Sequence, residues 1–253
     1  MIELEQVRAG YGKTEVLHGV DFKAKQGEIT TIIGTNGSGK STLLRTLLGF
    51  LPISAGDVKI DGISTENMSR AELARNIAYL PQGKNVPDIS ADRMVLHGRF
   101  PYLNYPRRYR ESDFQIAREA MRQMGIEELA GMQMSRLSGG MRQKVYLAMA
   151  LAQESPVIIM DEPTTYLDIG QQVKLAGIVR QLAKEGKTIV LVLHDILLAL
   201  KISHRIAAVA EGKIFWSGTP EEMLEQNVAE RLYGVAVGAV RTDRGMQYFY
   251  SIS

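Results

Sequence analysis

Short runs of apolar residues recur along the chain, and segments with the 3.6-residue spacing of amphipathic helices separate them. The runs are rich in β-branched residues, as strands are, and five of them predict strands: Ile29–Ile33, Ile77–Leu80, Val157–Met160, Ile189–Leu193 and Ile206–Ala210. Strands that alternate with helices in this way form mainly parallel sheets with helices on their faces. The pattern therefore predicts an α/β fold.

Turn residues predict antiparallel pieces beside this sheet. Asp61-Gly62 and Glu211-Gly212 lie between β-type residues, as the turns of hairpins do. Asp243-Arg244-Gly245 predicts a closing hairpin near the end of the chain. Thr219-Pro220-Glu221-Glu222 predicts a helix start, because Pro occupies the first helical position and a Glu follows the capping Thr by three residues.

The pattern changes in residues 87–155, where helical spacing dominates. Two sets of apolar residues have this spacing: Phe114, Ala117, Met121 and Met124, and Val145, Leu147, Ala148 and Leu151. We therefore expect a helical subdomain here, inserted into a core of residues 1–86 and 156–253, so that the chain is one domain. The methionines of this block are interpreted as helix packing rather than as a ligand site: Met121, Met124, Met132 and Met134.

Composition narrows the class of protein. The length of 253 residues and the 45% hydrophobic content suit one large α/β domain with a buried core. The absence of cysteine excludes disulfides and thiolate metal sites, and it is compatible with a reducing cytoplasm. A formal net charge of +2 argues against extended nucleic-acid binding, and the cluster of Arg107, Arg108 and Arg110 is interpreted as a solvated loop.

No apolar stretch predicts a membrane span. The best candidate, Thr188–Leu200, is interrupted by His194 and Asp195. The start of the chain, Met1–Glu5, has acids where a signal peptide has basic residues. We expect a soluble chain whose role at a membrane, if it has one, comes through a partner protein.

A glycine-rich loop carries the first candidate chemistry. It matches the phosphate-loop pattern G-x-x-x-x-G-K-[ST], follows the first apolar run and precedes the helix-like Thr42–Leu48: Gly34, Thr35, Asn36, Gly37, Ser38, Gly39, Lys40 and Ser41. Glycines let backbone N–H groups point at phosphate oxygens. Lys40 then supplies a positive charge to the β- and γ-phosphates, and the Ser41 hydroxyl is available to Mg²⁺. The loop predicts a nucleotide ligand.

Two further motifs follow this loop along the chain. Leu137–Gln143 reads Leu-Ser-Gly-Gly-Met-Arg-Gln and begins a helix-like run, and Val157–Glu162 is an apolar strand that ends in two acids. The three motifs, in this order, resemble the nucleotide-binding subunit of ABC transporters over essentially the whole chain. The resemblance implies a P-loop NTPase core with an antiparallel β flank, ATP as ligand and ATP hydrolysis as activity.

The resemblance also implies roles for single residues. Asp161 would bind Mg²⁺ through water, and Glu162 would polarise the attacking water as general base. Gln82 matches the family's Q-loop, which senses Mg²⁺ and this water. His194 matches the switch histidine that contacts the γ-phosphate, and Tyr11 matches the aromatic ring that stacks on adenine. Taken alone, the last three would be read as ordinary loop, structural and rim residues.

The signature motif implies a second copy of the chain. In this family it lies far from its own phosphate loop and cannot reach its own ATP. The resemblance therefore implies a head-to-tail dimer with two ATPs, each held between the Lys40 loop of one copy and the signature of the other: Ser138, Gly139 and Gly140. Asp168, in the D-loop, would lie across the same interface.

Weaker features resemble one transport subclass, the type II importers of iron chelates, haem and cobalamin. These are the aromatic Tyr166, the stretch Gly98–Tyr102 and the run Leu147–Gln153. Two places depart from the family pattern. Many relatives have proline at the position of Thr35, and polar residues commonly follow the switch histidine-aspartate where this chain has Ile196–Leu198. Neither departure removes a phosphate or Mg²⁺ ligand, so they bear only on the substrate group.

The importer interpretation implies partners and a location. Integral-membrane permease subunits would dock beside Gln82 and the stretch Pro87–Arg110, and a substrate-binding protein would act through them. The chain would then lie peripherally at the cytoplasmic side of the cell membrane. The residues expected to touch the permease are exposed aromatic and basic residues: Phe100, Tyr102, Tyr105, Arg107 and Arg108. The alternative is a soluble ABC-type ATPase that remodels nucleic acid or ribosomes.

Overall fold

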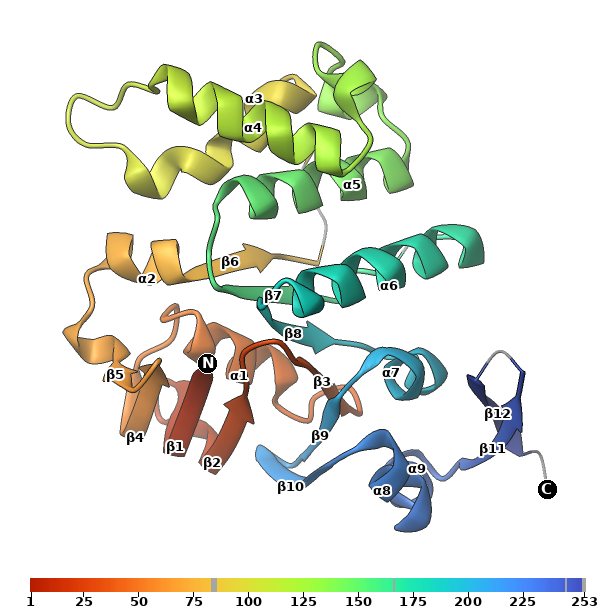
Figure 1. The fold of residues 1–253 in the computed structure, drawn as a ribbon. Helices are drawn as coiled ribbons and strands as arrows, with labels where there is room; N and C mark the ends of the chain where they lie inside the picture. The colour runs from red at the N-terminus through yellow and green to blue at the C-terminus, as the bar shows by residue number, and fades with distance from the viewer. Residues whose placement is uncertain (83–85, 166, 244, 252–253) are drawn as a thin grey trace. The chain divides into compact units, whose positions relative to one another are not determined.

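The computed structural model describes residues 1–82, 86–165, 167–243 and 245–251. Contacts divide the chain into two compact units, residues 1–67 with 176–253 and residues 68–175. Both are built from strands and helices that alternate along the chain (Figure 1). The α/β prediction is therefore confirmed, whereas the predicted limits of the helical subdomain stay a prediction.

A parallel sheet forms the core of the first unit. Its strand β3 (Ile29–Gly34) pairs in parallel with β8 (Thr188–Val192) on one side and β9 (Arg205–Ala210) on the other. Every residue of β3 and β8 is buried. The hairpin predicted at Glu211-Gly212 is confirmed, because β10 (Lys213–Gly218) returns antiparallel to β9.

A second, antiparallel sheet flanks the same unit. Its order is β2 (Thr14–Ala24), β1 (Ile2–Tyr11), β4 (Ile53–Ile60) and β5 (Ile63–Ser64). Asp61 and Gly62 both have positive φ, 49° and 80°, and they connect β4 to β5 as an Asx-Gly hairpin turn does. The predicted antiparallel flank is thereby confirmed.

The remaining elements of this unit are short. They are α1 (Lys40–Leu47), the 3-10 turn η1 (Thr65–Asn67), α7 (Ile196–Ile202), α8 (Pro220–Glu225), α9 (Val228–Tyr233), β11 (Ala236–Thr242) and β12 (Gly245–Ser251). The helix start at Thr219 is confirmed, because its hydroxyl accepts from the Glu222 N–H at 3.2 Å while the Glu222 carboxylate accepts from the Thr219 N–H at 2.7 Å. The closing hairpin is also confirmed, since β11 and β12 pair antiparallel.

The second unit combines two parallel strands with a group of helices. β6 (Ile77–Leu80) pairs with β7 (Val157–Asp161), and the helical elements are α2 (Arg70–Asn76), α3 (Ala91–Leu96), η2 (His97–Tyr102), α4 (Glu111–Gln123), η3 (Glu127–Leu129), η4 (Met134–Arg136) and α5 (Gly139–Ala152). α3, α4 and α5 pack on one another, drawn in yellow to green in Figure 1. α6 (Ile169–Lys184) begins in this unit and ends in the other.

The helix packing explains the methionine-rich stretch. Met121, Met124 and Met134 are buried, as helix-packing residues should be, whereas Met132 is exposed, which corrects its interpretation as a packing residue. Among the residues that the structure describes, no helix is long and apolar enough to cross a bilayer.

Candidate functional site

The phosphate loop begins where β3 ends, and its backbone leaves no space for a side chain at Gly34. A Cβ atom on Gly34 would lie 2.4 Å from the Val209 carbonyl oxygen and 2.6 Å from Ser38 Oγ. Gly39, which precedes the first turn of α1, has a φ of +108°, a conformation that L side chains rarely adopt. Only glycine fits these two places, so the loop can follow its tight course.

Lys40 lies across this loop. Its Nζ donates to the carbonyl oxygens of Gly34 and Thr35, both at 2.8 Å, and only 8% of the residue is exposed. The Ser38 hydroxyl is buried and has no hydrogen-bond partner within the described part of the chain. A buried ammonium and an unsatisfied hydroxyl beside a helix N-terminus fit an anion such as a phosphate chain.

The rest of the loop is open. Thr35, Asn36, Gly37 and Ser41 are exposed, whereas Thr42 is buried in the first turn of α1. An exposed hydroxyl at position 41 fits a cation ligand. Over residues 1–82, 86–165, 167–243 and 245–251, no group of three or more His, Asp or Glu side chains could hold a metal by itself. A cation here would therefore need oxygens of the bound phosphates as well.

The end of β7 brings two acids and a glutamine together. Glu162, the residue after the strand, is half-buried and has a φ of +48°, which is unusual for a side chain with a Cβ and is found at functional sites. Gln82 Nε2 and Thr165 Oγ1 both donate to Glu162 Oε2, the latter at 3.2 Å. The Tyr79 hydroxyl donates to Asp161 Oδ2 at 3.4 Å. The structure thus brings the side chain of Gln82 to the carboxylate of Glu162.

The signature residues lie at the start of α5. Ser138 caps this helix, with its hydroxyl accepting from the Met141 N–H at 3.3 Å, and it is exposed together with Gly139. A Cβ on Gly140 would lie 1.8 Å from Gln171 Oε1. Asp168 Oδ1 in turn accepts from the Gln171 N–H at 2.8 Å. Gln171 therefore joins the signature to the D-loop residue within one chain.

Two further candidates lie at strand ends of the first unit. His194 is exposed just after β8, and Asp195 caps α7 by accepting from the Leu198 N–H at 3.1 Å. Tyr11 ends β1, and 44% of it is exposed, so its ring has a face available for stacking. Tyr166, one of the residues used for the subclass, lies outside the described residues.

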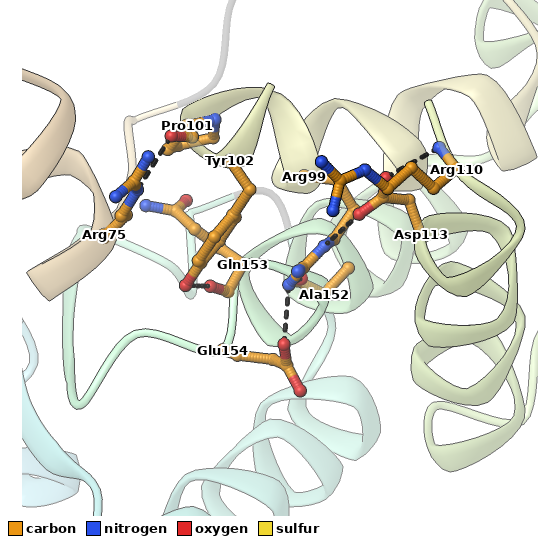
Figure 2. A network of polar contacts seen from close by, with 9 residues as sticks. All are labelled: Arg75, Arg99, Pro101, Tyr102, Arg110, Asp113, Ala152, Gln153 and Glu154. Carbon is orange, nitrogen blue, oxygen red and sulfur yellow. Dashed lines mark hydrogen bonds and ion pairs between the residues drawn. The ribbon is translucent and has the colours of Figure 1, made fainter. Parts of the chain in front are cut away.

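The stretch Gly98–Tyr102 contains a buried arginine. Arg99 is 6% exposed, and its guanidinium donates hydrogen bonds from Nε to Asp113 Oδ1 at 3.1 Å, from Nη1 to the Ala152 carbonyl at 2.8 Å and from Nη1 to Glu154 Oε2 at 2.7 Å (Figure 2). The arginine thus links η2 to the first turn of α4 and the end of α5. The sequence did not indicate this cluster, because its members are separated by 14 to 55 positions.

Tyr102 belongs to the same cluster, and this corrects the expectation that its side chain is exposed, whereas its contact with a permease stays a prediction. The Arg99 and Arg75 guanidinium carbons lie 4.1 and 5.4 Å from its ring centroid, and its hydroxyl donates to the Gln153 carbonyl at 2.9 Å (Figure 2). The ring is occupied inside the unit and is only half-exposed. Tyr102 therefore mainly packs beneath the exposed residues of this stretch.

Its neighbours are the exposed residues. Phe100 is 46% exposed with the Arg107 guanidinium carbon 4.5 Å from its ring centroid, Tyr105 is 98% exposed, and Arg108 is exposed. These four side chains remain available to a partner.

Comparisons with known proteins find a matching family model and similar sequences. The family model described as ABC transporter matches residues 17–165. The ferric enterobactin transport ATP-binding protein FepC of Escherichia coli is 40% identical over 233 residues, which cover 91% of this chain and 86% of FepC. The iron(3+)-hydroxamate import ATP-binding protein FhuC of Bacillus subtilis is 34% identical over 96% of this chain and 91% of FhuC.

Two solved structures share this fold. An inward-facing ABC transporter described as metal-chelate type matches with a TM-score of 0.86 at 24% identity, over 99% of this chain and 97% of that chain. A dimeric bacterial ABC transporter cassette matches with a TM-score of 0.75 at 31% identity, over 87% of this chain and 99% of that one.

Proposed function

The chain belongs to the ABC transporter family as an ATP-binding ATPase subunit, and from this premise we propose that it powers the import of an iron chelate. The relatives named for ferric enterobactin and iron(3+)-hydroxamate support an iron chelate over haem or cobalamin. They also favour an importer over the alternative of a soluble ATPase that remodels nucleic acid or ribosomes.

The contacts at Glu162 carry the chemical part of the proposal. Its carboxylate is held by Gln82 and Thr165 at the end of a buried strand, where a general base needs a fixed position toward water. Glu162 takes the proton of the attacking water, and Gln82 orients this water. His194 contacts the γ-phosphate, and Tyr11 stacks on adenine.

The phosphate loop binds the substrate in this proposal. The backbone N–H groups of residues 34–42 and the Lys40 ammonium hold the phosphates, and Lys40 exchanges its two carbonyl partners for phosphate oxygens. Ser41, Gln82 and Asp161 would hold Mg²⁺, which neutralises charge on the transferred phosphoryl group.

A bacterial ABC transporter cassette that is similar to this chain is dimeric in its solved structure, and this supports the head-to-tail dimer that we propose for this chain. Ser138, Gly139, Gly140 and Asp168 would face the ATP held by the partner copy. The surface beside them supports this, because Ile169 is 80% and Val173 is 66% exposed although both are apolar.

The permease would bind the surface that Arg99 and Tyr102 support. Phe100, Tyr105, Arg107 and Arg108 offer aromatic and basic groups to a cytoplasmic segment of a multi-span protein. The chain would then be held peripherally at the cytoplasmic side of the membrane, and an external binding protein would deliver the cargo.

Reconstituted vesicles test this proposal. The chain is combined with its copurifying permease, and uptake of a ferric siderophore is followed with ATP inside or outside the vesicles. We expect uptake only with ATP on the face that carries the chain. Glu162→Gln should lower hydrolysis by about 10³-fold and stop uptake while ATP still binds, because the amide keeps the shape and loses basicity. Hydrolysis stimulated by DNA or ribosomes, without any permease, would overturn the importer assignment.

A further inference from the structure

A tyrosine near the end of the chain touches the first residue of the phosphate loop. Tyr233, the last residue of α9, accepts a hydrogen bond on its hydroxyl from the backbone N–H of Gly34 at 2.8 Å, across 199 positions of sequence. No motif contains this tyrosine, and the proposed mechanism does not use it.

The pairing of β3 explains why this N–H requires a partner. The ladder between β3 and β8 ends at Ile32 and Val192, and the last bond along it runs from the Leu193 N–H to the Ile32 carbonyl at 3.2 Å. In a parallel ladder, alternate residues face the same neighbouring strand. Gly34, two residues beyond Ile32, therefore points its N–H to the side where β8 has ended. The Tyr233 hydroxyl takes the place of the next strand carbonyl.

The other side of Gly34 is also fixed. It pairs with Val209 of β9 so closely that a Cβ would lie 2.4 Å from the Val209 carbonyl oxygen. The Gly34 carbonyl in turn receives the Lys40 ammonium at 2.8 Å. Displacing Gly34 would therefore move both the start of the loop and one of the two oxygens that hold Lys40.

Tyr233 lies in a segment that reaches a second part of the site. Burial raises the pKa of Tyr250, on β12, and the nearby Asp195 carboxylate raises this pKa further. The same hairpin contacts α7, where Lys201 Nζ donates to Gln247 Oε1 at 3.2 Å. The segment from α9 to β12 thus contacts the start of the phosphate loop and the helix that follows His194.

We propose that Tyr233 is a positioning residue of the nucleotide site: its hydroxyl holds Gly34, and with it the phosphate loop, in the conformation that receives phosphates. The C-terminal segment from Val228 to Ser251 is thereby coupled to nucleotide binding. The inference rests on the proposed function, because it assumes that the loop binds ATP.

Tyr233→Phe tests the inference, because it removes one oxygen and keeps the ring. Binding of the non-hydrolysable analogue AMP-PNP with Mg²⁺ is measured by calorimetry on the full chain, well below its unfolding temperature. We expect about 3- to 10-fold weaker binding of AMP-PNP, which corresponds to the loss of one net hydrogen bond. Without this hydrogen bond the loop has other accessible conformations, so it is competent to bind for a smaller fraction of the time. Tyr248→Phe, on β12 of the same segment, is the matched control and should bind as the wild type does.

A second measurement separates positioning from plain stabilisation. Hydrogen exchange of the Gly34 amide should accelerate in Tyr233→Phe, while amides of α4, which belongs to the other unit, keep their rates. Unchanged AMP-PNP affinity in Tyr233→Phe, or an equal loss in Tyr248→Phe, would overturn the inference and leave the proposed function intact. A wild-type chain that binds no AMP-PNP would instead refute the proposed function itself.

Discussion

The phosphate loop and the Arg99 cluster are both fixed structures, but they are made from opposite parts of the chain. The loop is formed by backbone: glycines that exclude a Cβ, N–H groups, and carbonyls that hold Lys40. The Arg99 cluster is formed by side chains that join η2, α4 and α5. The loop keeps its shape because glycines lack a side chain at crowded positions. The cluster keeps its shape because particular side chains are present.

The difference determines how each region responds to substitution. Adding atoms should damage the loop, and removing atoms should damage the cluster. Pairs of substitutions should rescue the cluster, because two side chains can be replaced together. No second substitution can remove a main-chain carbonyl from the space beside Gly34.

The largest expected effect is on the cluster. Arg99→Met should lower the free energy of unfolding by about 3–5 kcal/mol, because it leaves the buried Asp113 carboxylate without its cation. Chemical denaturation measures the loss. The double variant Arg99→Met with Asp113→Leu should recover more than half of it. Failure of the double variant to recover any stability would contradict the side-chain description of this region.

An intermediate effect is expected in the loop. Gly34→Ala should weaken ATP binding by about 30-fold, roughly 2 kcal/mol, because its Cβ would meet the Val209 carbonyl. Gly177→Ala is the matched control: apart from the adjoining backbone of its own helix, no atom of the described residues lies within 4 Å of the added Cβ, and alanine suits the interior of α6. Equilibrium binding of a fluorescent ATP analogue measures both. Wild-type affinity in Gly34→Ala would show that the backbone can move and would break the comparison.

The smallest effect sharpens the comparison within the cluster. Tyr102→Phe keeps the ring between its two arginines and loses the hydrogen bond to the Gln153 carbonyl. The free energy of unfolding should fall by about 1 kcal/mol. Tyr105→Phe, at a residue that is 98% exposed, should leave it unchanged. Equal losses in the two variants would mean that the hydroxyl of Tyr102 has no structural role.

The same contrast explains what could be predicted from the sequence. The five predicted strands match the observed ones to within one residue at each end, because their apolar runs reflect burial directly. The phosphate loop was recognisable because its backbone geometry demands glycine at fixed positions. A motif of this kind can be recognised because it consists of consecutive residues.

Other features depend on long-range contacts. β1 and β2 were not predicted, because their register shifts around Gln6, whose φ is +48°, and this interrupts the alternation of a regular strand. Tyr102 was wrongly expected to be exposed, because nothing in its neighbourhood of sequence indicates that Arg75 would cover its ring. The assignments of Glu162, His194 and Gln82 to catalysis, and of the signature residues to ATP binding, stay predictions.

The packing of Gly140 against Gln171 has a consequence for the evolution of this family. A Cβ at position 140 would overlap the Gln171 side chain, and the Gln171 N–H is in turn held by Asp168. A relative that acquires a larger residue at the first of these positions must shorten or turn the side chain at the second. A larger residue at 140 should therefore occur either with a turned Gln171 side chain or with a shorter residue at 171, and in the second case the signature and the start of α6 change together over the history of the lineage.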